Sequence, residues 1–310
     1  MPGYAALLAH IAILESGEFN EAQQQAELSS QLRFTEHFSD DPRAVSVMAT
    51  VAARLFEDQR YAEALDISGS MLDRANLSEE HRQTALLVQG HAAFESQDFL
   101  LAEHAYAKLL EPERKLDAKR AEEINQRLAA SVYRQAETSV QDNSEQEAID
   151  NFIRVANVAP GSDIGESALF EATTLMLKLE QWPQSIPVLI EFRKQFPESE
   201  HQQEINQRLV FAYEQSERWT EAANELELLA SSLDEEAARE ARYLAASYYQ
   251  RANDPSSAIL AYAEYQQKYP QPFALNIEAL ATLIELHEQT DQWDKRTHCR
   301  KSWYKSNKPR

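Results

Sequence analysis

The chain repeats one arrangement of apolar and polar positions along its length. Apolar residues spaced three and four apart stop at a bend position, which is usually aromatic, and a small residue follows three positions later. Such spacing marks the buried face of an α-helix. Successive bends lie 36 to 46 residues apart, a period typical of a helical solenoid. The bend and following positions are Phe19/Ala22, Tyr61/Ala64, Phe99/Ala102, Glu145/Ala148, Trp182/Ser185, Trp219/Ala222, Pro255/Ala258 and Trp293/Arg296.

The unit from Gly165 to Pro197 illustrates the pattern. Trp182 and Pro183 separate two helical stretches, and proline is suited to the first turn of a helix because its missing N–H has no partner there. The second stretch ends at Phe196-Pro197. The predicted buried faces are Leu169, Ala172, Thr173 and Met176 in the first helix, and Ile186, Leu189 and Phe192 in the second. Each unit is therefore expected to form an antiparallel helix pair.

These units resemble the tetratricopeptide repeat (TPR), in which a small residue lies at the helix crossing, an alanine opens the second helix and a proline ends it. The resemblance covers essentially the whole chain. It implies an all-α fold, a right-handed α-solenoid of about eight antiparallel helix pairs, with residues 1–310 as a single domain. Units ending Phe196-Pro197 and Tyr269-Pro270 resemble those of bacterial envelope proteins, such as the barrel-assembly lipoprotein and the Tol–Pal-associated repeat protein.

The repeats depart from this scheme in places. The Glu145 unit lacks the aromatic residue and follows a step of 46 residues, which suggests a polar insertion at 139–147. This insertion would separate divergent repeats at 1–138 from more regular repeats at 148–310. Residues 4–9 are expected to open a first helix, and Arg296 replaces the usual small residue in the last unit. Since neither end has a clearly polar closing helix, we expect a piece of a longer protein.

Composition narrows the possible functions. Six glycines in 310 residues and the lack of alternating apolar and polar runs argue against a sheet-rich fold. A net charge of −21 argues against nucleic acid and against an anionic membrane surface as partners. No run of about 18 apolar residues predicts insertion into a bilayer. The single cysteine, Cys299, leaves the redox compartment open.

The sequence predicts no catalytic residues, no metal site and no cofactor. The eight histidines share no helical spacing, and glycine-rich phosphate loops are missing. His287-Glu288 begins like a zinc-protease helix, but Asp291 stands where the second histidine would be needed. We therefore expect a protein without enzymatic activity.

The resemblance implies a binding surface, because the first helices of TPR pairs line a concave groove that holds peptides. Two identical hexapeptides, Glu123–Leu128 and Glu204–Leu209, open first helices in the same register. A duplicated repeat without functional meaning is the alternative explanation for them. Projecting this register along the chain places the partner-binding candidates at Glu123, Gln126, Glu204, Gln207, Phe211, Glu214, Glu240, Tyr243, Glu278 and Glu285.

Most of these candidates are acidic, so the expected partner is a protein or peptide segment of basic character. The alternative is a chain that is acidic on every face. The leading functional prediction is a non-enzymatic scaffold, with bacterial envelope assembly in the periplasm suggested by the resemblance and a cytoplasmic adaptor as the alternative. Two further functions stay open: self-association through terminal repeats carrying Trp293 and Trp303, and substrate recruitment within a larger protein.

Overall fold

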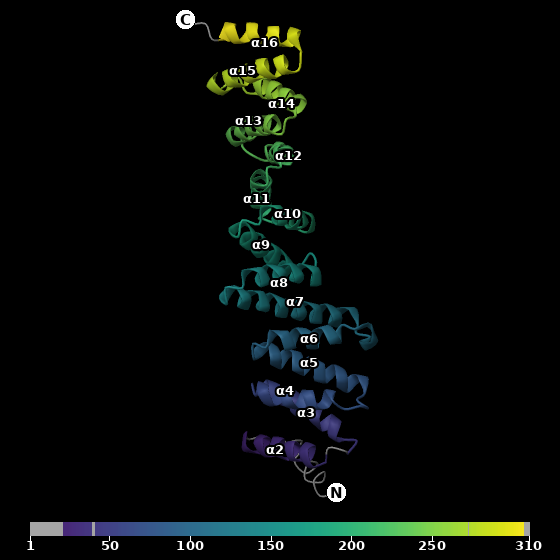
Figure 1. Cartoon of the computed structure of the whole chain (residues 1–310). Coiled ribbons are helices and arrows are strands. Elements are labelled where there is room, and N and C mark those ends of the chain that lie inside the picture. Colours follow the sequence, from purple (N-terminus) through teal and green to yellow (C-terminus); the bar gives the residue numbers. More distant parts are fainter. Residues whose placement is uncertain (1–20, 39–40, 272, 307–310) are drawn as a thin grey trace. The chain divides into compact units, whose positions relative to one another are not determined.

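The computed structural model describes residues 21–38, 41–271 and 273–306, and every regular element in these ranges is a helix (Figure 1). The helices are α2 (Glu21–His37), α3 (Ala44–Glu57), α4 (Tyr61–Leu72), α5 (Glu79–Glu95), α6 (Phe99–Leu109), the 3-10 turn η1 (Pro112–Arg114), α7 (Ala118–Gln141), α8 (Glu145–Val158), α9 (Asp163–Lys178), α10 (Trp182–Gln195), α11 (Gln202–Gln215), α12 (Trp219–Leu229), α13 (Glu235–Arg251), α14 (Pro255–Lys268), α15 (Phe273–Gln289) and α16 (Trp293–Ser306). The helix expected at residues 4–9 and the bend at Phe19 lie outside the described residues.

The chain forms two compact units, residues 1–168 and 169–310, and the boundary falls inside α9. The sequence pattern instead separated its two blocks at 139–147. A single continuous solenoid over 1–310 stays a prediction.

Consecutive helices pack as pairs, as the repeat pattern predicted. Unit 1 contains the pairs α3/α4, α5/α6 and α7/α8, and unit 2 contains α11/α12, α13/α14 and α15/α16. Phe170 of α9 also packs against Phe192 of α10, with ring centroids 6.4 Å apart. The all-α, TPR-like arrangement of helix pairs is confirmed.

The turn inside each of the seven described pairs has the same structure. Its second residue, two positions before the bend, adopts the left-handed conformation with φ between 55° and 64°. The next N–H then donates to a carbonyl five residues back; Arg60, for example, donates to Leu55 at 2.8 Å. This is the Schellman motif, in which glycine is usual. The left-handed positions here are Gln59, Gln97, Asn143, Glu180, Glu217, Asn253 and Asp291, and none is glycine.

The small residues after the bends lie where the two helices of a pair cross. Ala64, Ala102, Ala148, Ser185, Ala222 and Ala258 are all completely buried. A larger side chain at these points would separate the helices. The sequence pattern therefore identified the crossing positions correctly.

The aromatic residues at the bends are less buried than predicted. Trp182 and Trp219 are half-buried, and each contacts an aromatic ring of the following pair. Trp293 was also expected in the core, but 50% of its surface is exposed. Trp182 and Trp219 are each covered by the helix pair that follows them. Trp293 is more exposed because no further pair follows α16 within the described residues.

The long step before Glu145 does not come from an insertion at 139–147. Residues 139–141 form the last turn of α7, and the turn to α8 has the same three-residue length as the other turns. The additional residues instead extend the other end of α7, which has 24 residues, and the connection that precedes it. That prediction was wrong because the polar residues of 139–147 occupy helix ends and a standard turn.

Gly90 of α5 should be essential for packing in unit 1. A Cβ atom at this position would lie 2.6 Å from Cε1 of Tyr106, whose side chain is completely buried. We expect Gly90→Ala to lower the free energy of unfolding of unit 1 by about 1–3 kcal/mol, as overpacking does.

Gly69→Ala in α4 is the matched control, because a Cβ atom there meets nothing within 4 Å. Alanine at that helical position should instead stabilise by about 0.5–1 kcal/mol. Thermal unfolding of both variants measures the effect. Equal unfolding temperatures would contradict the assigned contact.

Candidate functional site

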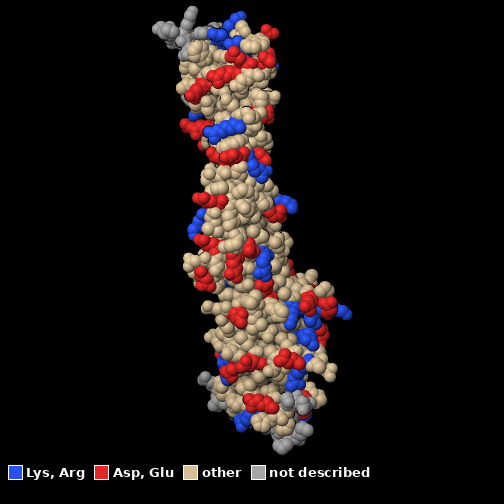
Figure 2. All heavy atoms as spheres, in the orientation of Figure 1, with Lys and Arg blue, Asp and Glu red and all other residues tan. Residues whose placement is uncertain are grey.

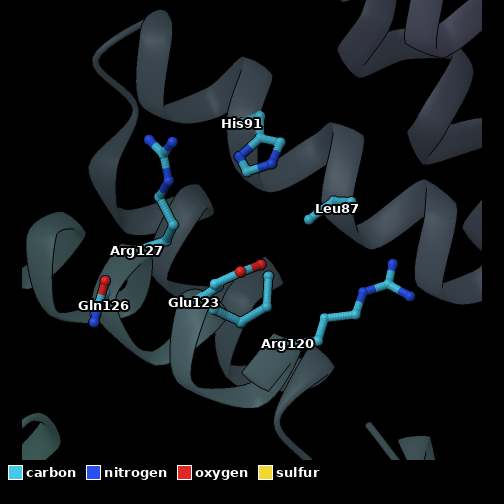
Figure 3. Close-up of a pocket in the computed structure, with 7 residues that line it drawn as sticks. Leu87, His91, Arg120, Glu123, Gln126 and Arg127 are labelled. Carbon is cyan, nitrogen blue, oxygen red and sulfur yellow. The ribbon is translucent and has the colours of Figure 1, made fainter. Parts of the chain in front are cut away.

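Unit 1 carries a pocket between α5 and α7, the first helices of two consecutive pairs (Figure 3). Its cavity volume is about 400 Å³. We call it the basic pocket, and its lining residues are Leu87, His91, Arg120, Glu123, Ile124, Gln126 and Arg127. Ile124 is 4% exposed, so an apolar floor lies beneath a polar and charged rim.

A partly buried hydrogen bond supports the wall of this pocket. Nδ1 of His91 lies 2.7 Å from the hydroxyl oxygen of Tyr106, whose side chain is completely buried. Burial, assisted by the positive charge of Arg127, lowers the pKa of His91 to about 4. Burial also raises the pKa of Tyr106. Both groups are therefore neutral near pH 7.

The hydroxyl proton of Tyr106 needs an acceptor because it is out of reach of water. Within the described residues its hydrogen-bond partner is His91, and the hydroxyl donates to Nδ1 in the tautomer that leaves this nitrogen unprotonated. The other ring nitrogen, Nε2, then carries the proton and is a donor. In Figure 3 the His91 ring and the Arg127 side chain lie on the same side of the pocket.

The rim of the basic pocket holds two guanidinium groups and one carboxylate. Arg120 and Arg127 come from exposed positions of α7, and in Figure 3 Glu123 lies between them. Neither arginine forms a salt bridge among the described residues, whereas Glu123 lies 3.9 Å from Lys119. Figure 2 shows Lys and Arg atoms beside Asp and Glu atoms near the α6–α7 connection. The surface of unit 1 is thus not uniformly acidic, in spite of the overall charge of −21.

Two further cavities of unit 1 involve neighbouring helices. One, of about 580 Å³, lies between α2 and α3. We call it the acidic pocket, and its lining residues are Gln24, Glu27, Thr50, Ala53, Arg54, Glu57 and Asp58. A smaller cavity of about 150 Å³, the aromatic cavity, is lined by Phe56, His91, Phe94, Glu95, Tyr106 and Arg127.

Two of the predicted binding residues, Glu123 and Gln126, are among those that line the basic pocket. Their hexapeptide buries Ile124 and Leu128, and the second hexapeptide buries Ile205 and Leu209 in the same way. The two copies thus share a buried face. However, 123–128 lies about two turns further from its bend than 204–209, because α7 is longer at its N-terminal end.

In unit 2, Glu204 takes part in a packed cluster rather than standing alone on a groove wall. Its carboxylate lies 2.7 Å from Arg208 Nη2. The Arg208 guanidinium stacks on the Phe170 ring at 4.1 Å and donates to the hydroxyls of Thr173 and Thr174 at 2.8 and 2.9 Å. This cluster joins α9 to α11, and Glu204 balances its charge.

Two other predicted acidic residues of unit 2 also join consecutive first helices. Tyr243 of α13 donates its hydroxyl to Glu278 of α15 at 3.1 Å. Glu214 of α11 hydrogen-bonds Tyr248 of α13, and burial, followed by this bond, raises the pKa of Tyr248 to about 12. These carboxylates therefore already have intramolecular partners.

The remaining candidates of unit 2 differ in their surroundings. Phe211 is 43% exposed and meets the edge of Trp182, with ring centroids 5.2 Å apart. Gln207, Glu240 and Glu285 are exposed. A partner-binding role for any of these residues stays a prediction.

Sequence reasoning missed Leu87, His91, Arg120 and Arg127 as pocket residues. Arg120 and Arg127 follow one helical face with Glu123, at spacings of three and four residues, and this was the available signal. His91 could not be found in this way, because its exposure to the pocket depends on how α5 packs against α7.

Within the described ranges, no three His, Cys, Asp or Glu side chains converge in a way that could hold a metal ion. None of the described helices has the length and apolar character needed to cross a bilayer.

Comparison with known proteins gives similarities at the level of solved structures. No family model and no curated protein matches the chain. A tetratricopeptide repeat protein from Parabacteroides merdae is 13% identical, with 92% of this chain and 99% of that chain covered and a TM-score of 0.33. The TPR domain of P58(IPK) is 16% identical, with 99% and 89% covered and a TM-score of 0.27. The C-terminal part of a TPR repeat-containing protein from Cytophaga hutchinsonii is 13% identical, with 84% and 95% covered and a TM-score of 0.33.

The cluster around Arg208 leads to a prediction for unit 2. Glu204→Lys would place a second positive charge beside Arg208, whose side chain is 14% exposed. We expect the free energy of unfolding to fall by about 1–2 kcal/mol. Glu240→Lys has the same change of charge at an exposed position and should change it by less than about 0.5 kcal/mol. Urea unfolding of both variants tests this, and equal losses would rule out the structural role of Glu204.

The low pKa of His91 predicts an acid-sensitive unit 1. The imidazole binds a proton at about pH 6.5 in the unfolded chain but only at about pH 4 in the folded chain, so the unfolded state binds more protons between these values. Stability should therefore fall as the pH is lowered from 6.5 to 4.

His91→Gln keeps an acceptor for Tyr106 and removes the titrating group. The difference between the two unfolding curves across this pH range isolates His91 from all other histidines. Parallel pH profiles for the two proteins would show that the His91 ring is solvated.

Proposed function

We propose that this chain is a non-enzymatic interaction scaffold whose unit 1 holds a polypeptide segment along α3, α5 and α7. The basic pocket is the observation that carries the proposal. It opens between first helices, and it combines an apolar floor at Ile124 with the donors of His91, Arg120 and Arg127. Apolar contact area with a few placed polar groups is what recognition of a peptide segment requires.

Stacked helix pairs suit this task because their first helices present neighbouring surfaces to one extended ligand. The carboxylates and arginines near the basic pocket have no arrangement of nucleophile, base and orienting group, so binding rather than catalysis is the function we assign. We include bacterial envelope assembly, which the sequence resemblance suggests, as the proposed biological setting of this scaffold. As a second part of the proposal, unit 2 binds a basic segment of the partner. The residues available for this contact are exposed: Gln207, Glu240 and Glu285.

Self-association is the second candidate function. Trp293 is 50% exposed at the start of α16, in the last described helix pair. Exposed tryptophan is a common anchor of protein interfaces. Concentration-dependent mass that disappears in Trp293→Ala would favour this function over the first.

Site-specific photo-crosslinking tests the proposed scaffold. In the test variant a crosslinking side chain replaces Glu123, which is exposed at the basic pocket. In the control variant it replaces Leu100 of α6, which is 69% exposed and lines none of the three cavities. With a peptide library as ligand, we expect covalent peptide adducts at position 123 and at least about tenfold fewer at position 100. Equal labelling at both positions would contradict a binding site on this face.

A further inference from the structure

The basic pocket, the aromatic cavity and the acidic pocket follow one another on unit 1. The basic pocket and the aromatic cavity share two lining residues, His91 and Arg127. The aromatic cavity continues onto α3 through Phe56, whose neighbour Glu57 lines the acidic pocket. The rings of Phe56 and His91 lie against each other, with centroids 5.7 Å apart. The helices that line the three cavities contact one another in series, α2 with α3, α3 with α5, α5 with α6 and α6 with α7.

The two ends of this series have opposite charge. In the acidic pocket three carboxylates stand against one guanidinium. That guanidinium, from Arg54, is bound to the buried Glu27 at 3.0 Å, which leaves Glu57 and Asp58 exposed. In the basic pocket two guanidinium groups stand against the single carboxylate of Glu123.

The middle of the series is mainly aromatic. Phe56 and Phe94 line the aromatic cavity from α3 and α5, and the buried Tyr106 supports it from α6. Glu95 and Arg127 bring one charge of each sign. A volume of about 150 Å³ is suited to one apolar side chain.

We propose that unit 1 recognises a bipolar segment: a polypeptide with a basic end, an apolar middle and an acidic end. The basic end binds at Glu57 and Asp58, the apolar side chain enters at Phe56 and Phe94, and the acidic end binds at Arg120 and Arg127. This inference rests on the proposed function and specifies its partner. Complementary potential of this kind fixes the register of a ligand as well as its identity.

A segment of uniform charge fits less well at one end. A wholly basic segment would meet Arg120 and Arg127, and a wholly acidic one would meet Glu57 and Asp58. The distance between the ends follows from helix packing, because neighbouring helices lie about 8–10 Å apart. Two such steps separate the pockets, so about five or six extended residues should join the charged ends.

Fluorescence anisotropy with designed peptides tests the inference. The first peptide has a lysine pair at one end and a glutamate pair at the other, joined by about five small and apolar residues. The second has the same composition with lysine and glutamate alternating. We expect the first to bind the full chain about tenfold more tightly at low salt, and this preference to shrink as salt is added.

Charge-reversed variants locate the two ends. Arg120→Glu, and separately the double change Glu57→Lys/Asp58→Lys, should each abolish the preference for the first peptide. Combining all three changes reverses both ends, so the first peptide should bind again, turned end for end. Lys108→Glu and Asp66→Lys are the controls: both residues are exposed and line none of the three cavities, and the preference should persist in them. Circular dichroism verifies that each variant keeps its helices.

The outcomes separate this inference from the proposed function. Equal binding of both peptides, reduced in Arg120→Glu, would overturn the bipolar partner and leave the scaffold in place. No binding of either peptide, together with equal crosslinking at positions 123 and 100, would overturn both. Recovery of binding in the combined variant would support the inference, because general loss of folding cannot restore affinity.

Discussion

The geometry of the structure depends on the turn that closes each helix pair. Its left-handed second residue lets the following N–H reach back to the first helix, and this reverses the chain within three residues. The completely buried small residue after the bend then allows the helices to cross closely. Because the turn is the same in all described pairs, the first helices of consecutive pairs within a unit present their faces side by side. The basic pocket of unit 1 lies between two such first helices, α5 and α7.

Close packing also determines what the pocket wall can do chemically. Gly90 leaves the space that the Tyr106 ring fills, and the Tyr106 hydroxyl in turn holds Nδ1 of His91. A backbone position without a side chain thus makes room for the ring whose hydroxyl contacts an imidazole that reaches the surface. The adjoining arginines need no such support, because they extend from an exposed face of α7.

The acidic character of the chain has two different structural roles. In unit 2, Glu204, Glu214 and Glu278 each have a partner on the same or a neighbouring first helix. In unit 1, Glu57 and Asp58 remain exposed beside a cavity. Net charge therefore describes the solubility of the chain better than it describes any single binding surface.

The sequence by itself determined the helix pairs, their crossing positions and the face of each hexapeptide that becomes buried, because helical periodicity depends on local spacing alone. Only the tertiary structure decided which charges stay available to a partner. Whether Arg208 meets Phe170 and Thr173, or Arg120 and Arg127 border a cavity, depends on which helices become neighbours and how far each extends. The N-terminal extension of α7, which has 24 residues against 14 in α11, places its hexapeptide about two turns further from the bend and at the basic pocket, a distance-dependent effect that no local pattern contains.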